Sequence, residues 1–567
     1  MKRKTLLVIC TLLVLAMVFS ACAPVEKAAP TKEAEPTKEG EPEEAAPTEV
    51  VEVPLEGKTL VVGVAAGSAG LDPDFHSGRA RHFVLRNTSA ALLGYPPLSI
   101  GDNYISDFKN IAGDLAEKWV ISDDWSSITI TLKKGVLSSA GNELTADDVI
   151  YKFQRSEALK GLGWGLSSLA LQIDKASDVE KIDKYTFKIN GKSPTVLMEH
   201  FQAHDMSVLY DSTEYLKHKT EADPWSTDWA SKNFVGFGPY KITEWIPGEK
   251  EVWERNENYF NPSAITGNID KIIFLDIPES SSRLALLESG EIDIALDLSA
   301  SELLSLKNNP DVRVDTHEGN HIFWMQFPSA NAETPQYADV NVRKAIQFAT
   351  PYKDILDRAF LGFAKQMKCT VAPVYNGYDE ISKIWNTSQD LVKAKEYLSK
   401  SQWPDGFDTK VYYDASIEGQ EETGILIKSA LAEIGINVEL VKLQTADYYV
   451  KAFGGSGFDG MNLYREMVGV PMAAFHTFLY FVKGHCCAPG GFQLDSVDAL
   501  YKQQIEAIGD EATQIKIQKE IENIAWNEYP TGAPLGYLGY QVAVRKNVSG
   551  WWWQSLNELL FMKVIKK

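Results

Sequence analysis

One stretch of this chain carries a strand, a helix and a second strand in close succession. Residues 409–413 are typical of a strand, and residues 421–434 have the apolar spacing of an amphipathic helix. Gly435 ends that helix, and residues 436–443 are typical of a second strand. Two strands joined by a helix pair in parallel within one sheet. The sequence therefore predicts an α/β fold with at least one partly parallel sheet.

The size and charge of the chain narrow the range of functions. Its 567 residues allow roughly two to four domains, and its 44% apolar and 23% charged residues are ordinary for a soluble globular protein. The formal net charge is −21, so the chain lacks the basic surface that releases counterions from a phosphate backbone. We therefore expect no nucleic-acid partner.

The N-terminus has the layout of a secretory signal. Basic residues at positions 2–4 precede an uncharged run over residues 5–21, and Cys22 follows directly after small residues. This junction resembles the lipobox of bacterial lipoproteins, which implies a signal peptide over residues 1–21 and a lipidated Cys22. A short transmembrane anchor is the alternative. Both place the rest of the chain outside the cytoplasmic membrane.

A linker follows the cysteine. Residues 23–53 hold no aromatic side chain, and they contain five prolines and a repeated hexad that begins Pro-Thr-Lys-Glu. Such a composition cannot bury enough apolar surface to offset the loss of chain entropy on folding. We expect residues 22–53 to be a disordered tether that holds a globular head away from a membrane.

Catalytic motifs are scarce in this sequence. No Gly-x-Ser-x-Gly motif occurs, and Gly191-Lys192-Ser193 lacks the upstream glycine of a phosphate-binding loop, because Thr186 occupies that position. The chain therefore carries no coupling ATPase of its own.

Two histidines and the many carboxylates leave weaker alternatives open. His200 and His204 would share one helix face, as a metal site requires, but the glutamate of a zinc protease is missing between them. Two polar histidines without a metal are the favoured interpretation. Paired carboxylates are common in any acidic chain, so a secreted glycosidase-like hydrolase with an acidic pair remains the alternative function.

Several segments follow one another along the chain in a characteristic order. They are Ile111-Ala-Gly-Asp-Leu-Ala-Glu-Lys-Trp-Val, Gly141-Asn-Glu-Leu-Thr-Ala-Asp-Asp-Val, Gly236-Phe-Gly-Pro-Tyr-Lys-Ile, Glu254-Arg-Asn-Glu-Asn-Tyr-Phe, Arg283-Leu-Ala-Leu-Leu-Glu-Ser-Gly-Glu-Ile-Asp-Ile-Ala and Asp339-Val-Asn-Val-Arg-Lys-Ala-Ile. In this order they resemble the family 5 extracellular solute-binding proteins, which are the receptors of oligopeptide, dipeptide and nickel ABC importers. The resemblance covers about residues 57–550.

The resemblance implies a two-lobed α/β fold of the type II periplasmic-binding-protein kind. The first lobe would span residues 54–318, with an inserted subdomain over about residues 102–224. The second lobe would span residues 319–536, and residues 537–567 would return to the first lobe. A ligand would lie between the lobes and be enclosed by closure about a hinge.

The resemblance also implies which residues line the cleft. The chain would cross between the lobes at residues 321–327 and 534–540. Trp324 and Gln326 on one crossing, with Tyr537 and Tyr540 on the other, are candidate cleft-wall residues. Ordinary strand core is the alternative for each of them.

Ligand class depends on residues 457–471. Peptide-binding relatives carry an aspartate there that pairs with the ligand's ammonium group, and counting back from Pro471 puts Met467 in that place. Burying an ammonium without a counter-charge costs several kcal/mol, which favours a neutral oligosaccharide slightly over a peptide. Glu466 could still supply the carboxylate after a one-residue shift. Asn462, Tyr464 and Glu466 therefore join the candidate ligand-binding residues.

The expected protein is a lipid-tethered, monomeric receptor that needs no cofactor and performs no covalent chemistry. Its partners would be the solute and separate permease and ATPase subunits of an ABC importer. Cys369, Cys486 and Cys487 could form a disulfide outside the cytoplasm, and His485 makes a soft-metal site conceivable. A structural cystine in a loop is the favoured interpretation.

Overall fold

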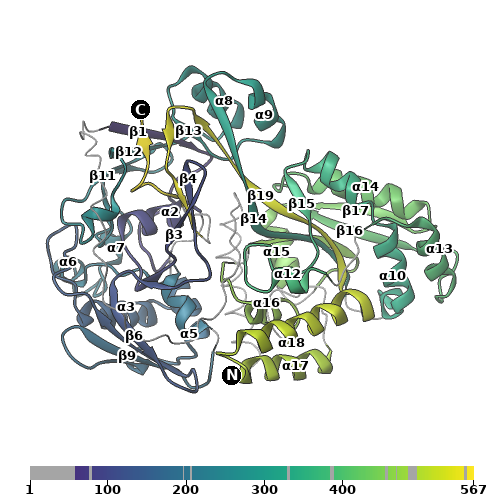
Figure 1. Cartoon of the computed structure of the whole chain (residues 1–567), viewed down its shortest axis with the longest axis horizontal. Coiled ribbons are helices and arrows are strands. Elements are labelled where there is room, and N and C mark those ends of the chain that lie inside the picture. Colours follow the sequence, from purple (N-terminus) through teal and green to yellow (C-terminus); the bar gives the residue numbers. More distant parts are fainter. Residues whose placement is uncertain are drawn as a thin grey trace, which may run out of the picture.

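The computed structural model of the protein shows two lobes joined by long strands (Figure 1). It describes residues 58–75, 79–195, 197–204, 207–328, 333–383, 388–453, 457–467, 469–482, 494–554 and 559–567. The predicted signal peptide, Cys22 and the predicted linker therefore lie outside the described residues, as do His485, Cys486 and Cys487. No helix among the described residues is long and apolar enough to cross a membrane.

One mixed sheet of eleven strands runs through both lobes in the order β10-β11-β12-β1-β13-β19-β14-β18-β16-β17, with β15 paired to β19. Its strands are β1 (Lys58–Val64), β10 (Tyr240–Ile246), β11 (Lys250–Arg255), β12 (Ile269–Asp276), β13 (Ile294–Ala295), β14 (Val312–Gln326), β15 (Ala364–Gln366), β16 (Asp408–Asp414), β17 (Asn437–Leu443), β18 (Met461–Met467) and β19 (Gly532–Arg545).

The antiparallel pair β14 and β19 joins the lobes (Figure 1). We call the part of the chain before β14, with the segment after β19, lobe one, and the part between these strands lobe two. Residues 321–326 of the first predicted crossing lie on β14, which begins earlier, at Val312, and ends one residue short of the predicted 327. The second predicted crossing, residues 534–540, lies within β19, which extends beyond it at both ends. Both strands are long enough to belong to both half-sheets. The two-lobed α/β fold is thus confirmed.

The predicted strand–helix–strand unit forms part of lobe two. β16 pairs in parallel with β17, from Asp408 opposite Asn437 to Asp414 opposite Leu443, and α14 (Gln420–Ala432) connects them. Gly435 ends the connection with a φ of 85°, and a side chain there would meet the carbonyl oxygen of Asp405 at 2.7 Å. Glycine meets both constraints because it has no Cβ.

A separate sheet in lobe one lies within residues 102–224, the stretch expected to form an inserted subdomain and called the subdomain below. Its strand order is β6 (Ala116–Ile121), β7 (Ser127–Leu132), β9 (Thr186–Asn190) and β8 (Val179–Lys181). Helices of the subdomain are α3 (Ala146–Leu159), α4 (Leu162–Leu171), α5 (Leu197–His200) and α6 (Ser212–Lys217). α3 begins with a capping box that Thr145 forms with Asp148.

Short strands and further helices complete the lobes. The strands are β2 (Leu93–Gly94), β3 (Pro97–Ile100), β4 (Asn103–Ser106), β5 (Ala112–Gly113), β20 (Val548–Ser549), β21 (Trp552–Trp553), β22 (Leu559–Leu560) and β23 (Ile565–Lys566). The helices are α2 (Arg79–Thr88), α7 (Thr227–Ala230), α8 (Ser280–Ser289), α9 (Ala300–Ser305), α10 (Val340–Ala349), α11 (Tyr352–Asp354), α12 (Tyr378–Ile381), α13 (Leu391–Ser399), α15 (Thr445–Phe453), α16 (Ala473–Tyr480), α17 (Asp495–Glu506) and α18 (Glu511–Asn523). After β19 the chain returns to lobe one, where β21 pairs with β4.

Apolar cores cover both faces of β14 and β18 in lobe two. Trp324 and Tyr464 belong to one core, together with side chains of α15, α16 and α18. Phe323 and Leu463, their neighbours along the strands, belong to the other core with side chains of α10 and α14. Successive strand residues point to opposite faces, so this sheet is buried on both sides.

Candidate ligand-binding site between the lobes

A pocket of about 550 Å³ lies between the lobes, beside β19. We call it the interlobe pocket. Its lobe-one wall comes from the turn after β13 and the start of α9, and its lobe-two wall comes mainly from the connection between β16 and α14. The lining residues are Ser280, Asp297, Leu298, Ser299, Ala300, Leu303, Ala359, Phe360, Phe363, Ala415, Ser416, Ile417, Glu418, Gly419, Glu421, Arg465, Leu538, Gly539 and Gln541.

Local hydrogen bonds hold the lobe-one wall. Asp297 has a φ of 60°, and its Oδ2 accepts a bond of 3.4 Å from the amide of Ala65, which follows β1. Ser299 caps α9 in a capping box with Glu302, and the Ser280 hydroxyl donates to Glu302 Oε1 at 2.9 Å. These bonds satisfy amides at the start of α9 and fix the turn that carries Asp297.

The lobe-two wall is ordered around Asp414, the last residue of β16. Its Oδ1 accepts bonds from the Ser416 amide at 2.9 Å, the Ser416 hydroxyl at 2.8 Å and the Thr445 hydroxyl at 2.9 Å. The turn that follows brings Glu418 to lobe one, where its Oε1 accepts a bond of 2.9 Å from the amide of Ala300. One side chain of lobe two thus reaches the backbone of lobe one at the mouth of the pocket.

Charges of both signs line the interlobe pocket. Asp297, Glu418 and Glu421 contribute carboxylates, and Arg465 contributes a guanidinium. Glu418 is exposed at the pocket mouth, but nearby protein atoms still raise the pKa of its carboxyl by desolvation; Glu302 adds to this increase and Arg465 opposes it. A hydrogen bond from Lys442 lowers the pKa of Glu421, so that group is ionised at neutral pH.

Gln541 provides a hydrogen-bond donor in the same pocket. Its Nε2 is buried and has no hydrogen-bond partner among the described residues. A buried amide without a partner costs about 1–3 kcal/mol, so a ligand that accepts a bond there would gain affinity.

The sequence-predicted residues on β14 and β18 lie together, but they do not line this pocket. Trp324 is opposite Tyr464, with ring centroids 5.7 Å apart. Gln326 is opposite Asn462, whose Nδ2 donates to Gln326 Oε1 at 3.0 Å. Glu466 follows on the same face and accepts a bond from the Tyr464 hydroxyl. We call these residues the β14–β18 strip.

Helices of lobe two cover the β14–β18 strip. Tyr480 of α16 packs edge-on against Trp324 with centroids 4.9 Å apart, and Trp526 lies 6.3 Å from the same ring. Exposure of the strip residues is 7% at most. Arg465 lies between Tyr464 and Glu466 in sequence, so alternation directs it to the opposite face, where it lines the interlobe pocket.

The predicted tyrosines of β19 do not line the interlobe pocket either. The Tyr537 hydroxyl donates to the carbonyls of Cys369 at 2.7 Å and Val371 at 3.1 Å. Tyr540 is buried against Trp553, edge to face. Gln541, the next residue along, lines the pocket. The sequence argument thus missed Arg465 and Gln541, which immediately follow two of its candidates.

The weaker metal hypotheses gain no support from the geometry. α5 ends at His200, so His204 does not continue the same helix face, and the His200 Nδ1 lies 3.0 Å from the Tyr95 hydroxyl. The Cys369 thiol donates to the Val371 carbonyl at 3.2 Å. The described part of the chain contains no group of three or more His, Cys, Asp or Glu side chains suited to a metal ion.

Comparison with known proteins places this two-lobed architecture in a family. Residues 110–468 match the profile of the bacterial extracellular solute-binding proteins, family 5, middle region. This match spans more than half of the chain. The chain belongs to family 5 of the extracellular solute-binding proteins.

Individual members of family 5 extend the likeness beyond the profile. Heme-binding protein A of Haemophilus influenzae is 27% identical over 415 residues, which cover 66% of this chain and 74% of that protein. The "Probable D,D-dipeptide-binding periplasmic protein DdpA" of Escherichia coli K12 is 25% identical over 509 residues, 88% of this chain and 93% of that protein. The Helicobacter pylori periplasmic binding protein DppA, solved with the peptide STSA, shares the fold with a TM-score of 0.71 at 23% identity, covering 90% of this chain and 98% of that one.

Family 5 membership makes the protein an extracytoplasmic solute-binding protein. None of the relatives named above is described as a hydrolase, so the hydrolase alternative receives no support from them.

Proposed function

We propose that this protein is the receptor of an ABC importer that captures a short, zwitterionic, peptide-like solute in the interlobe pocket. A separate permease with its ATPase would receive the solute unchanged. The observation that carries the proposal is the presence of carboxylates and a guanidinium in one pocket lined by both lobes.

The pocket chemistry matches the two ends of a peptide. Arg465 can form a charge-assisted pair with a carboxylate, and the Gln541 amide can donate to a neighbouring oxygen. Asp297 and Glu421 offer carboxylates to an ammonium group at other points of the wall. Phe360 and the aliphatic residues of the lining provide the apolar surface that most of a ligand buries.

This chemistry reverses the slight preference for an oligosaccharide. That preference assumed that the carboxylate expected at Met467 was lost without replacement. The interlobe pocket instead contains three carboxylates, so a cationic group would have a counter-charge. The names of the relatives DdpA and DppA, which refer to dipeptides or to a bound peptide, support the same class.

Contacts between the lobes support a clamp that closes about β14 and β19. The Glu418–Ala300 bond lies at the pocket, and Phe108 of lobe one meets Tyr375 of lobe two edge-on, with centroids 5.7 Å apart. A ligand that touches both lobes favours the closed form by its differential affinity for the two states. Residues 22–53 would tether this clamp to the membrane through lipidated Cys22, and the receptor would act as a monomer.

Calorimetry on the purified protein tests the proposal. We expect tri- and tetrapeptides to bind with a Kd on the order of 1 μM, which is about −8 kcal/mol. N-acetylation or C-amidation of the peptide should each weaken binding tenfold or more, because each removes one of the two peptide charges that the pocket would pair. The substitution Arg465→Ala should abolish the effect of amidation, whereas Arg358→Ala, an exposed arginine outside the pocket, should change nothing.

Two results would contradict this proposal. One is saturable binding of neutral hexaoses with no binding of peptides. The other is the appearance of cleavage products during incubation with peptides or oligosaccharides, which would favour the hydrolase.

A further inference from the structure

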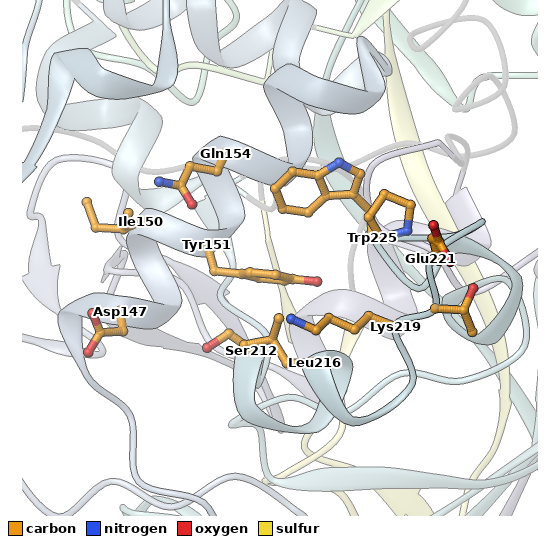
Figure 2. Close-up of a pocket in the computed structure, with 11 residues that line it drawn as sticks. Asp147, Ile150, Tyr151, Gln154, Ser212, Leu216, Lys219, Glu221 and Trp225 are labelled. Atoms are coloured by element: carbon orange, nitrogen blue, oxygen red, sulfur yellow. The ribbon is translucent and has the colours of Figure 1, made fainter.

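A second pocket, of about 850 Å³, lies on the inserted subdomain of lobe one (Figure 2). We call it the subdomain pocket; it shares no lining residue with the interlobe pocket. One face of α3 forms one wall, and α6 and the segment after it form the others. The lining residues are Asp147, Ile150, Tyr151, Gln154, Ser212, Leu216, Lys219, Thr220, Glu221, Pro224 and Trp225.

An aromatic pair forms the centre of the subdomain pocket. The rings of Tyr151 and Trp225 lie with centroids 5.7 Å apart and tilted by 52°. Tyr151 is only 7% exposed, and its hydroxyl is buried without a hydrogen-bond partner among the described residues. Figure 2 shows this hydroxyl directed toward the space between Trp225 and Lys219. A group that bonds this hydroxyl would remove the cost of leaving it unpaired.

The buried Arg155 side chain holds the backbone of Trp225 in place. The Trp225 carbonyl accepts a bond of 2.9 Å from Arg155 Nε, and the Arg155 guanidinium pairs with Asp72 and Asp74, each at 2.6 Å. Arg155 is fully buried. A backbone held in this way presents the indole in one place, which reduces the entropy cost of binding.

The lining selects a chemical class by elimination. An anion would face the carboxylates of Asp147 and Glu221, and a strong cation would face the ammonium of Lys219. A purely apolar guest would leave the Tyr151 hydroxyl unpaired. A neutral ring with an apolar face and hydroxyl groups that both donate and accept suits every wall: the face stacks on an indole, and the hydroxyls meet polar side chains.

We propose that the subdomain pocket binds a neutral saccharide, with one sugar ring stacked on Trp225 and its hydroxyl groups bonded to Tyr151 and Gln154. This site is separate from the solute site and independent of the proposed transport function. It would give the receptor a weak attachment to carbohydrate outside the cell, with a Kd on the order of 1 mM because the pocket is open and makes few hydrogen bonds.

Saturation-transfer NMR on the whole protein tests this inference, with glucose hexaoses in α-1,4 and β-1,4 linkage and a xylose hexaose as probes. We expect at least one probe to bind, Trp225→Ala to weaken it at least tenfold, and Tyr151→Phe, which removes only the hydroxyl, to weaken it several-fold. Trp229→Ala is the matched control, because Trp229 of α7 is a half-buried indole of lobe one that does not line the pocket.

Peptide calorimetry and the melting temperature of each variant separate this site from the proposed function. Loss of saccharide binding in both pocket variants, with peptide binding unchanged, supports the inference, even if peptides bind to no form of the protein. If Trp225→Ala fails to fold, the saccharide affinity of Tyr151→Phe alone tests the inference. The inference is overturned if no hexaose binds up to about 20 mM. Hexaose binding that persists in both pocket variants, or that peptides compete away, also overturns it.

Discussion

The amide of Ala300 in lobe one donates a hydrogen bond of 2.9 Å to Oε1 of Glu418 in lobe two, at the mouth of the interlobe pocket. This bond joins the lobes without passing through β14 or β19. The bond is therefore lost if these two walls of the pocket separate. The pKa of the Glu418 carboxyl is raised by desolvation, so its ionised form is less favourable here than in water.

Glu418→Ala should shift the protein toward an open form and weaken peptide binding severalfold, since the Ala300 amide loses its partner. Glu418→Gln keeps an acceptor oxygen and should bind as the parent does. Because the folded pKa is raised, ionisation of Glu418 lowers stability as pH rises through the carboxyl range, and this loss should vanish in Glu418→Gln. Small-angle scattering and melting temperatures across pH measure both effects; equal scattering from the parent and Glu418→Ala would contradict the role of the bond.

Arg155→Met should destabilise the protein by about 3–5 kcal/mol, because it leaves the buried carboxylates of Asp72 and Asp74 without a counter-charge. Urea unfolding measures the change. The exposed pair of Arg358 with Glu422 is the control, and Arg358→Met should cost less than about 1 kcal/mol. Equal losses of unfolding free energy in the two variants would show that the buried ion pairs of Arg155 contribute no more than the exposed pair of Arg358.

Asp459 should make the free energy of unfolding depend on pH in the acidic range. Burial would raise the pKa of its carboxyl, but hydrogen bonds from Lys410 and Tyr412 lower it to about 2. The unfolded value is about 3.9, so the stabilisation is complete above that pH and is lost as pH falls toward 2. Asp459→Asn should flatten this part of the curve by about 1 kcal/mol or less, as the site is partly exposed. Asp405→Asn, at an exposed aspartate, is the control, and identical acid curves for parent and Asp459→Asn would refute the assignment.

Trp324→Ala tests whether the β14–β18 strip is core or binding site. The Trp324 ring is 4% exposed and packs against Tyr464 and Tyr480, so its removal should lower the free energy of unfolding by about 3–5 kcal/mol. Peptide affinity of the protein that remains folded should change little. A large loss of affinity at unchanged stability would instead assign the strip to the ligand.

Cys22→Ser tests the tether. Expressed from its full sequence in a bacterial host, the parent should partition into detergent and incorporate labelled fatty acid, because acyl chains bind membranes. The serine variant should do neither. Labelling of the variant would place the lipid elsewhere, and an unlabelled parent would favour the transmembrane alternative.

Local patterns in the sequence were sufficient for much of the fold. The parallel pair β16 and β17 follows from apolar period and a turn glycine that act over a few residues. The two crossing strands were instead implied by the family resemblance. The ordered motifs were sufficient for the family, which the profile match confirms.

The face of each strand that meets the interlobe pocket was decided only by tertiary structure. Tyr464 and Arg465 are neighbours, as are Tyr540 and Gln541, and one member of each pair lines the pocket while the other is buried in a core. Alternation fixes that neighbours point to opposite faces, but it does not say which face a second lobe will leave open. Helices cover both faces of β14 and β18, so the pattern of polar and apolar residues along these strands does not indicate which residues line the pocket. The position of the pocket is determined by the packing of two distant parts of the chain against each other.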